Sequence, residues 1–176
     1  MTNNTLYFGY GSNLWLDQMK RRCPESKYIG VASLSDWWGI RPETVKELAV
    51  SHSLDRRWII NDRGYANIIP SSGDIVYGLV FELTASDEIS LDKYEGPTYE
   101  KQHIPVDLAP KDDAVNGHSV KSLIYVDVER KTERREPVEE YIYRMNMGIR
   151  DALNEGIPAS YIKKYLRSFI PEPVEN

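Results

Sequence analysis

The sequence predicts an α+β fold in which short strands curl into a barrel or a strongly curved sheet. Its strands follow one another along the chain instead of alternating with helices, which is typical of α+β domains. Many short strands in a small domain often form a barrel. The chain has 176 residues, so we expect one domain over residues 1–176.

The first strand and the first helix are joined by a glycine-containing turn. Leu6 to Tyr10 is rich in aromatic residues and predicts a strand. Gly11-Ser12-Asn13 predicts a turn, and either Ser12 or Asn13 could cap the helix that follows. Pro24 should end this helix.

A hairpin and a long strand are predicted next. Arg57 to Ile60 and Tyr65 to Ile69 flank Asn61-Asp62-Arg63-Gly64, which is a good hairpin turn. Ile75 to Leu83 reads as a strong strand that contains Gly78. A glycine inside a strand predicts a bulge or a close approach of another backbone.

The middle of the chain predicts a short helix between strands. Thr84-Ala85-Ser86-Asp87 has the spacing of a capping box, so a helix should run from there to about Tyr94. Gly96 lies where a C-terminal cap belongs. His103 to Leu108 and Val120 to Val128 predict two more strands.

Two helices are predicted to close the chain. Pro137 should open a long helix at its first turn, because proline is favoured there. Gly156 should end that helix, and Pro158 should start a final short one. We expect the tail from Pro171 to Asn176 to fray.

Composition narrows the classes of partner and the compartment. The hydrophobic and charged fractions, 41% and 28%, are those of a globular protein. A net charge of −5 argues against nucleic acid and anionic membranes as partners. The single cysteine, Cys23, suggests a reducing compartment. With no basic leader and no apolar run of about 18 residues, we expect a cytoplasmic protein.

Several common chemistries do not fit the sequence. The histidines, His52, His103 and His118, are far apart and lack ligand spacing, which argues against a zinc site. Ser12 lies in Gly-Tyr-Gly-Ser-Asn, which is not the nucleophile motif Gly-x-Ser-x-Gly. Leu14 stands where a dinucleotide fingerprint requires its third glycine.

Two features remain as candidates for function. The turn Gly11-Ser12-Asn13 could present backbone amides to an anion, although an ordinary strand-to-helix connection is the favoured interpretation from these residues alone. Glu95 ends a predicted helix, where the helix dipole disfavours a carboxylate. A solvent-exposed glutamate is again the simpler interpretation of that segment alone.

Taken together, the motifs resemble the γ-glutamylcyclotransferase family in its broad sense, which includes the AIG2-like proteins. They cover the chain from about Leu6 to Leu166, and their order and spacing are more specific than any one of them. They are Tyr7-Phe8-Gly9-Tyr10-Gly11-Ser12-Asn13-Leu14, Gly64 to Ile68, Gly73 to Val80, Leu91-Asp92-x-x-Glu95-Gly96, and Met147-Gly148 followed by Gly156-Ile157-Pro158.

The resemblance implies a fold and a reaction. The fold is a small closed or nearly closed β-barrel flanked by helices, with a polar cavity. In the reaction, the α-amine of a γ-glutamyl group attacks its own γ-carbonyl, so that 5-oxoproline forms and the attached amine leaves. Such ring closure needs positioning and proton transfer, and no cofactor is expected.

The resemblance also implies the site residues. Glu95 would be the catalytic acid–base group, in a partly desolvated place that raises its pKa. The substrate-binding loop would be Tyr7 to Leu14, mainly through the amides of Gly11, Ser12 and Asn13. Three tyrosines would shape the cavity or pack in the core, namely Tyr99, Tyr125 and Tyr141. The segment after Glu95, which contains Tyr99, is shorter than in the enzymes for free γ-glutamyl amino acids, and here the sequence departs from their pattern.

Other functions stay open at this point. One is removal of γ-glutamyl groups from glutathione-derived conjugates, suggested by the unusual segment Trp37 to Arg57. Another is a non-catalytic binder of γ-glutamyl-type ligands, against which the presence of Glu95 argues. The last is a structural or interaction protein. The expected partner is a small γ-glutamyl substrate, and a homodimer is an open alternative to a monomer.

Overall fold

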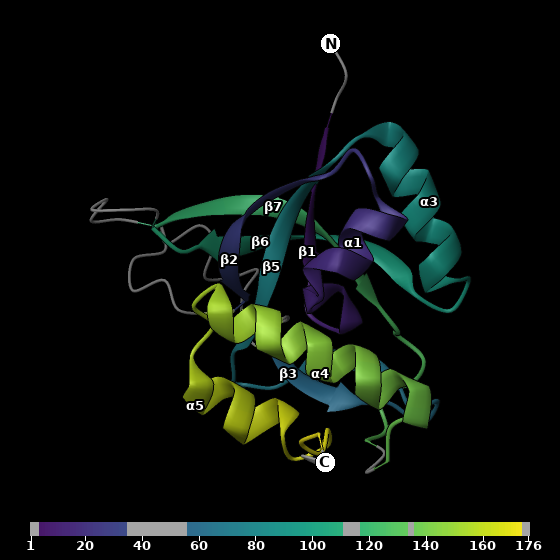
Figure 1. The fold of residues 1–176 in the computed structure, drawn as a ribbon, viewed down its shortest axis with the longest axis vertical. Helices are drawn as coiled ribbons and strands as arrows, with labels where there is room; N and C mark the ends of the chain where they lie inside the picture. The colour runs from purple at the N-terminus through teal and green to yellow at the C-terminus, as the bar shows by residue number, and fades with distance from the viewer. Residues whose placement is uncertain (1–3, 35–55, 111–116, 134–135, 174–176) are drawn as a thin grey trace, which may run out of the picture.

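Five strands among the described residues close into a barrel in a computed structural model of the protein (Figure 1). The structure describes residues 4–34, 56–110, 117–133 and 136–173. The order around the barrel is β1-β5-β2-β6-β7. The barrel strands are β1 (Thr5–Gly9), β2 (Lys27–Leu34), β5 (Val76–Leu83), β6 (Glu100–Leu108) and β7 (His118–Val126). With helices around this barrel, the predicted α+β class is confirmed.

Four neighbouring pairs are antiparallel, and β1 pairs with β7 in parallel to close the barrel. Gly78 lies in β5 beside the end of β1, with which β5 pairs. A Cβ atom on Gly78 would come within 2.6 Å of the carbonyl oxygen of Gly9 and of the Phe8 ring. The predicted close approach at this glycine is therefore confirmed, whereas the register shift lies on β2, between Tyr28 and Gly30.

The predicted hairpin is present, but it forms a two-stranded sheet of its own outside the barrel. Its strands are β3 (Arg56–Ile60) and β4 (Ala66–Pro70), and its turn contains Gly64 at a φ of 85°. The fully buried Trp58 of β3 donates from Nε1 to the carbonyl oxygen of Tyr10, 3.0 Å away. This bond joins the hairpin to the turn that follows β1.

The first helix begins later than the sequence predicted. A 3-10 turn, η1 (Ser12–Leu14), precedes α1 (Leu16–Arg22), whose N-cap is Trp15. The expectation that Ser12 or Asn13 caps this helix is wrong. Their side chains instead accept hydrogen bonds from Gln18 Nε2, at 3.0 Å and 2.9 Å, and so turn inward.

The middle helix agrees with its predicted caps. In α3 (Ala85–Glu95), Thr84 and Asp87 form the capping box, and Gly96 follows with a φ of 76°. These two caps fix both ends of the helix, so Glu95 is its last residue.

The long C-terminal helix, α4 (Glu139–Asn154), lies across the end of the barrel that carries η1 (Figure 1). The prediction that Pro137 opens its first turn is wrong. Val138 takes the N-cap position, because its backbone amide donates to the carbonyl oxygen of Gly64 at 3.1 Å. A short helix follows as α5 (Ala159–Tyr161) and continues as the π-helical turn η2 (Ile162–Leu166).

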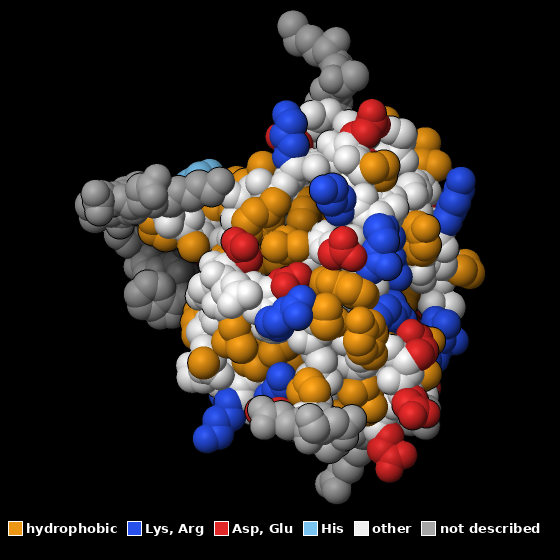
Figure 2. All heavy atoms as spheres, viewed as in Figure 1, with side chains coloured by type: hydrophobic (Ala, Val, Ile, Leu, Met, Phe, Trp, Pro, Cys, Tyr) orange, Lys and Arg blue, Asp and Glu red, His pale blue; other side chains and the backbone are white. Residues whose placement is uncertain are grey.

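Some sequence predictions fall outside the described residues. They are most of Trp37 to Arg57, His52, most of the loop from Pro110 to His118, and residues 174–176 of the tail. In the part that is described, no helix is long and apolar enough to cross a membrane. On the face drawn in Figure 2, acidic and basic side chains of the described residues are interspersed with hydrophobic ones.

Candidate active site

A cavity of about 240 Å³ opens where the turn after β1, the end of α3, the β3–β4 hairpin and the start of α4 meet. This size suits a small metabolite. Tyrosines, arginines and a single carboxylate dominate the lining. The lining residues are Tyr7, Tyr10, Gly11, Ser12, Asn13, Arg22, Arg63, Tyr65, Ala66, Tyr94, Glu95, Tyr99, Tyr125, Tyr141 and Arg144.

Glu95 supplies the carboxylate of this cavity. Its Oε1 accepts a hydrogen bond from Asn13 Nδ2 at 3.0 Å. Burial raises the pKa of Glu95, while Arg22, the Asn13 bond and Arg144 act in the opposite direction. The result is a raised pKa, which agrees in direction with the expectation of a partly desolvated group.

Asn13 connects the turn to its surroundings through both ends of its side-chain amide. Besides Glu95, its Nδ2 donates to the hydroxyl of Tyr7 at 2.8 Å. Its Oδ1 accepts from Gln18 Nε2 at 2.9 Å and from Arg22 Nη1 at 3.0 Å. Four partners thus hold the amide so that its NH₂ group faces Glu95. Burial and the nearby Glu95 raise the pKa of the Tyr7 hydroxyl well above its usual value, so it keeps its proton.

The turn packs tightly against Tyr141 of α4. The Tyr141 hydroxyl accepts from the backbone amides of Ser12 at 3.2 Å and Ala66 at 3.4 Å. A Cβ atom on Gly11 would lie 2.9 Å from this hydroxyl and 3.1 Å from the Ala66 side chain. A side chain at position 11 would therefore clash with its neighbours, which explains the glycine. A ligand that binds the Ser12 amide would have to share this amide with the Tyr141 hydroxyl. Burial raises the pKa of Tyr141 to about 12.

The other two predicted tyrosines also line the cavity. The Tyr99 hydroxyl donates to the carbonyl oxygen of Ala66 at 2.9 Å, which ties the segment after α3 to the hairpin. The Tyr125 hydroxyl donates to Asp92 Oδ1 at 2.5 Å and is thereby engaged by a carboxylate of α3. Burial is the main cause that raises the pKa of both hydroxyls, so both stay protonated at neutral pH.

Three residues of the predicted binding loop do not reach the cavity. Phe8 and Leu14 are fully buried in the hydrophobic core, and Gly9 lies in β1 against Gly78. They support the turn from behind. The other predicted site residues are brought together at the cavity, namely Tyr7, Tyr10, Gly11, Ser12, Asn13, Glu95, Tyr99, Tyr125 and Tyr141.

Sequence reasoning missed the arginines of the cavity. Arg144 follows Tyr141 by three residues on α4, and this helical spacing could have placed both on one face. Arg22 belongs to the basic C-terminal end of α1. The sequence shows these basic residues but gives no sign that one of them lines a cavity. Arg63 was given no role, because only the position of the hairpin outside the barrel brings it here.

Metal chemistry has no evident site in the described part of the chain. There, no three His, Cys, Asp or Glu side chains cluster in a way that could hold a metal ion. Cys23 is buried, and burial raises the pKa of its thiol to about 12, which suppresses its nucleophilic form.

Fold and cavity together define a class of protein: a closed, helix-flanked barrel with one carboxylate facing a glycine-containing turn in a polar cavity of metabolite size. Comparison with known proteins makes the assignment specific. The model of the family described as Gamma-glutamyl cyclotransferase, AIG2-like, matches residues 7–145, and the chain belongs to this family.

Curated relatives carry the same name. The chain is 27% identical to a Bos taurus Gamma-glutamylcyclotransferase over 90% of its own length and 76% of the bovine protein. It is 31% identical to a Mus musculus Gamma-glutamylcyclotransferase over 76% of its length. This second alignment spans about half of the mouse protein, 54% of its length.

Solved structures agree in fold. A structure described as Gamma-glutamyl cyclotransferase superposes with a TM-score of 0.68 at 24% identity, over 99% of this chain and 92% of that one. A human protein described as uncharacterized gives the same TM-score at 22% identity, over 98% and 91%. A yeast cyclotransferase described as specific to glutathione gives 0.54 at 11% identity, over 94% and 95%. At these identities the likeness concerns the fold alone.

Proposed function

We propose that this protein is a γ-glutamylcyclotransferase that releases 5-oxoproline and a free amine or amino acid from γ-glutamyl amino acids or peptides. The observation that carries the proposal is the 3.0 Å contact between Glu95 and Asn13, which sets a buried acid–base group against the glycine-containing turn of the cavity. Family membership supplies the reaction class.

The reaction requires proton transfer from the attacking nitrogen to the departing nitrogen. The α-ammonium of the γ-glutamyl group must lose a proton before its nitrogen can attack the γ-carbonyl carbon. Glu95 accepts that proton, the new C–N bond closes the five-membered ring, and the old C–N bond breaks as the proton passes to the departing nitrogen. The ring nitrogen loses its second proton to leave the neutral lactam, and the released amine takes it up and leaves as an ammonium ion. General acid–base catalysis of this kind contributes about 10² to 10⁴ in rate. A raised pKa suits Glu95 to both directions of transfer.

The α-carboxylate of the substrate is assigned to the turn. The amides of Gly11, Ser12 and Asn13 would face it, since backbone amides at such a turn bind anions. Arg144 adds positive charge there, because its Nη1 donates to the Ser12 hydroxyl at 3.2 Å. Tyr99, Tyr125 and Tyr141 then act as neutral walls that hold the reacting groups close, as ring closure requires.

The remaining features of the proposal follow from the reaction. Cyclotransfer of this type uses no cofactor, and we infer a cytoplasmic enzyme whose partner is its small substrate. The alternative of glutathione-derived conjugates depended on the segment Trp37 to Arg57, most of which lies outside the described residues. A binder without catalysis would have no use for the costly burial of Glu95.

The test is product identification. Purified protein is incubated with a panel of γ-glutamyl dipeptides, glutathione and glutathione S-conjugates, and both 5-oxoproline and glutamate are quantified. The proposal predicts 5-oxoproline in equal amount to the leaving amine, with no glutamate. Glutamate as the product would indicate hydrolysis, and no turnover across the panel would contradict the proposal. The conjugate alternative predicts turnover confined to the S-conjugates.

A further inference from the structure

The three arginines that line the cavity differ in what holds them. Arg144 is paired with Glu140 by two bonds of 2.8 Å and 2.9 Å. Arg22 donates to Asn13 at 3.0 Å. Arg63 donates from Nη1 to the hydroxyl of Thr98 at 2.5 Å, and among the described residues no carboxylate forms an ion pair with it. Arg22 and Arg63 thus have neutral hydrogen-bond partners, but Arg22 also acts on the Glu95 carboxylate, whereas Arg63 lies beside Thr98 and the Tyr65 ring.

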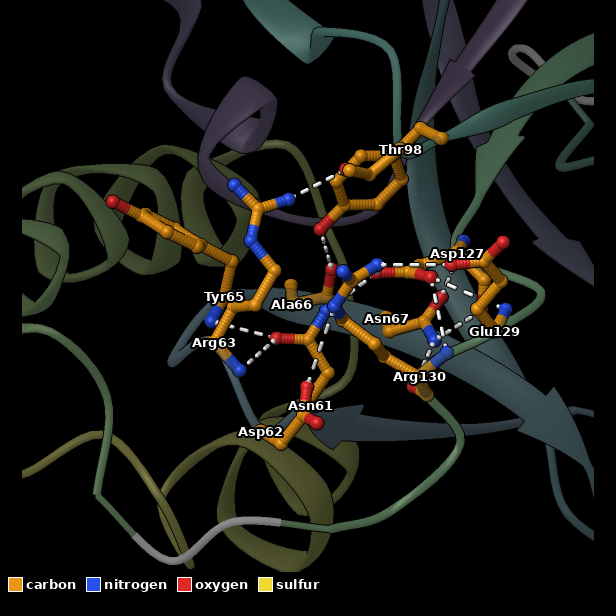
Figure 3. Close-up of polar contacts among 11 residues, drawn as sticks. Asn61, Asp62, Arg63, Tyr65, Ala66, Asn67, Thr98, Asp127, Glu129 and Arg130 are labelled. Atoms are coloured by element: carbon orange, nitrogen blue, oxygen red, sulfur yellow. Dashed lines mark hydrogen bonds and ion pairs between the residues drawn. The ribbon is translucent and has the colours of Figure 1, made fainter.

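The backbone beneath Arg63 is firmly held (Figure 3). Asn61 Oδ1 accepts from the amides of Arg63 at 3.1 Å and Tyr65 at 3.2 Å. The amide of Gly64 donates to the Asn61 carbonyl oxygen at 2.9 Å. Asn61 is completely buried, and its Nδ2 donates to the buried Asp127 at 3.3 Å. The exposed Arg63 side chain therefore extends from a rigid turn, which lowers the entropy cost of binding with it.

Arg63 lies on a different wall from the other two arginines. Arg22 and Arg144 are the cations that act on Glu95. Arg63 instead acts on Tyr99, and Figure 3 shows its side chain extending away from Asn61 toward Thr98. Thr98 and Tyr99 belong to the segment between α3 and β6. Arg63 thus lies at the exposed rim of the cavity, on the side of Thr98 and Tyr99.

We propose that Arg63 determines specificity by binding a carboxylate on the leaving amine, next to its nitrogen. The inference rests on the proposed cyclotransferase reaction and narrows its substrates to γ-glutamyl α-amino acids. Such a substrate has two carboxylates. The turn takes the carboxylate of the glutamyl group, so the second one, on the departing amino acid, faces the rim where Arg63 can form two parallel hydrogen bonds.

The test compares two substrates that differ by this carboxylate alone, γ-glutamyl-L-alanine and γ-glutamylethylamine. We expect the protein to prefer γ-glutamyl-L-alanine by about tenfold in kcat/KM, the effect of one charge-assisted contact near the surface. Arg63→Met should remove this preference by raising KM for the alanine substrate, with kcat and the ethylamine substrate little changed. Arg63→Lys should retain part of the preference. Lysine keeps the positive charge, but it cannot form the two parallel hydrogen bonds that a guanidinium forms with a carboxylate.

Arg150→Met is the matched control. Arg150 lies on α4 with its side chain 61% exposed, and it does not line the cavity, so the preference should persist. Equal kcat/KM values for the two substrates with the unchanged protein would overturn the inference. So would an equal loss for both substrates in Arg63→Met, which would make Arg63 a general binding residue. If neither substrate yields 5-oxoproline, the cyclotransferase proposal fails, and this inference fails with it.

Discussion

Glu95 combines an energetic cost with a chemical use. It ends α3, where the helix dipole opposes a carboxylate, and burial further disfavours its charge. Arg22, Asn13 and Arg144 offset part of this cost. A group so placed lowers stability when it is ionised, and it is poised to exchange a proton for the same reason.

Glu95→Gln should therefore stabilise the fold in a pH-dependent way. Since the pKa of Glu95 is raised in the folded state, ionisation costs stability above that pKa and costs nothing below the unfolded pKa, where both states are protonated. The variant should have a higher Tm than the original protein at pH 7, and the gain should vanish near pH 4. Thermal unfolding across this pH range tests it. A gain that is independent of pH would contradict the raised pKa.

Gly11 is the second residue on which the site depends. Gly11→Ala places a methyl group 2.9 Å from the Tyr141 hydroxyl, so either the turn or Tyr141 must move. We expect KM for γ-glutamyl substrates to rise about tenfold, equivalent to about 1.4 kcal/mol, with a smaller change in kcat. Adding Tyr141→Phe removes the clashing oxygen and should recover part of the loss. Unchanged KM in the single variant would show that this turn does not bind substrate.

At the level of elements, the site is formed where α4 presses on η1. Gly148 is a point of close approach in this contact, since a Cβ atom there would lie 3.0 Å from Leu14 Cβ and 3.1 Å from the Trp15 backbone nitrogen. The Tyr141 hydroxyl reaches the Ser12 amide from the same helix. The position of α4 thus sets the shape of the anion-binding turn.

Gly148→Ala should destabilise the protein even though alanine favours helix. The intrinsic gain of about 1 kcal/mol is outweighed by overpacking, which costs about 1–3 kcal/mol. We expect a net loss of about 1 kcal/mol in urea unfolding, together with a raised KM. Asn154→Ala, at an exposed position of α4, is the control and should be neutral. A more stable Gly148→Ala variant would mean that the contact can relax without cost.

The elements also show where sequence reasoning succeeded. Helix ends that depend on neighbouring residues alone were predicted correctly, such as the capping box at Thr84 and the glycine cap at Gly96. Ser12, Asn13 and Pro137 were misassigned because tertiary contacts outweighed local preference. The side chains of Ser12 and Asn13 accept hydrogen bonds from Gln18 instead of capping α1. The backbone amide of Val138 donates to the carbonyl oxygen of Gly64.

At the scale of the whole molecule, the hairpin outside the barrel completes the cavity. Asn67 and Asp127 join it to the residue that follows β7 by a reciprocal pair, in which Asn67 Nδ2 donates to the Asp127 carbonyl at 2.9 Å and the Asp127 amide donates to Asn67 Oδ1 at 3.0 Å. Both residues are buried. Tyr99 and Tyr141 then bond to Ala66 of the same strand, so this anchor determines where one wall of the cavity lies.

Asn67→Ala should cost about 1–3 kcal/mol of unfolding free energy, because it leaves the buried amide of Asp127 without its partner. The loss should appear in urea unfolding, and KM should rise while kcat for bound substrate changes less. Asn67→Asp keeps an acceptor for that amide but loses the donor to the carbonyl oxygens of Asp127 and Arg130, so it should also destabilise the protein. If Asn67→Ala matched the original protein in both stability and KM, the hairpin would be held by other contacts.

The sequence predicted the barrel class, the hairpin and most of the residues around the cavity, since ordered motifs carry that information. It did not show that the hairpin forms a separate sheet outside the barrel. Neighbouring residues predict the antiparallel pairing of the hairpin, but its place beside the barrel depends on the distant contacts of Asn61, Asn67 and Asp127. Arg63 was missed for the same reason. The positions of the hairpin and of Arg63 depend on contacts between residues far apart in the sequence, which local patterns do not predict.

The most direct test of the account is 5-oxoproline release from γ-glutamyl-L-alanine by the original protein and by Glu95→Gln, with circular dichroism to establish that both are folded. The account predicts equal amounts of 5-oxoproline and alanine from the original protein, and a rate about 10² to 10⁴ lower for the variant, since glutamine cannot accept the proton. A folded Glu95→Gln protein with a rate within about tenfold of the original would contradict the role of Glu95.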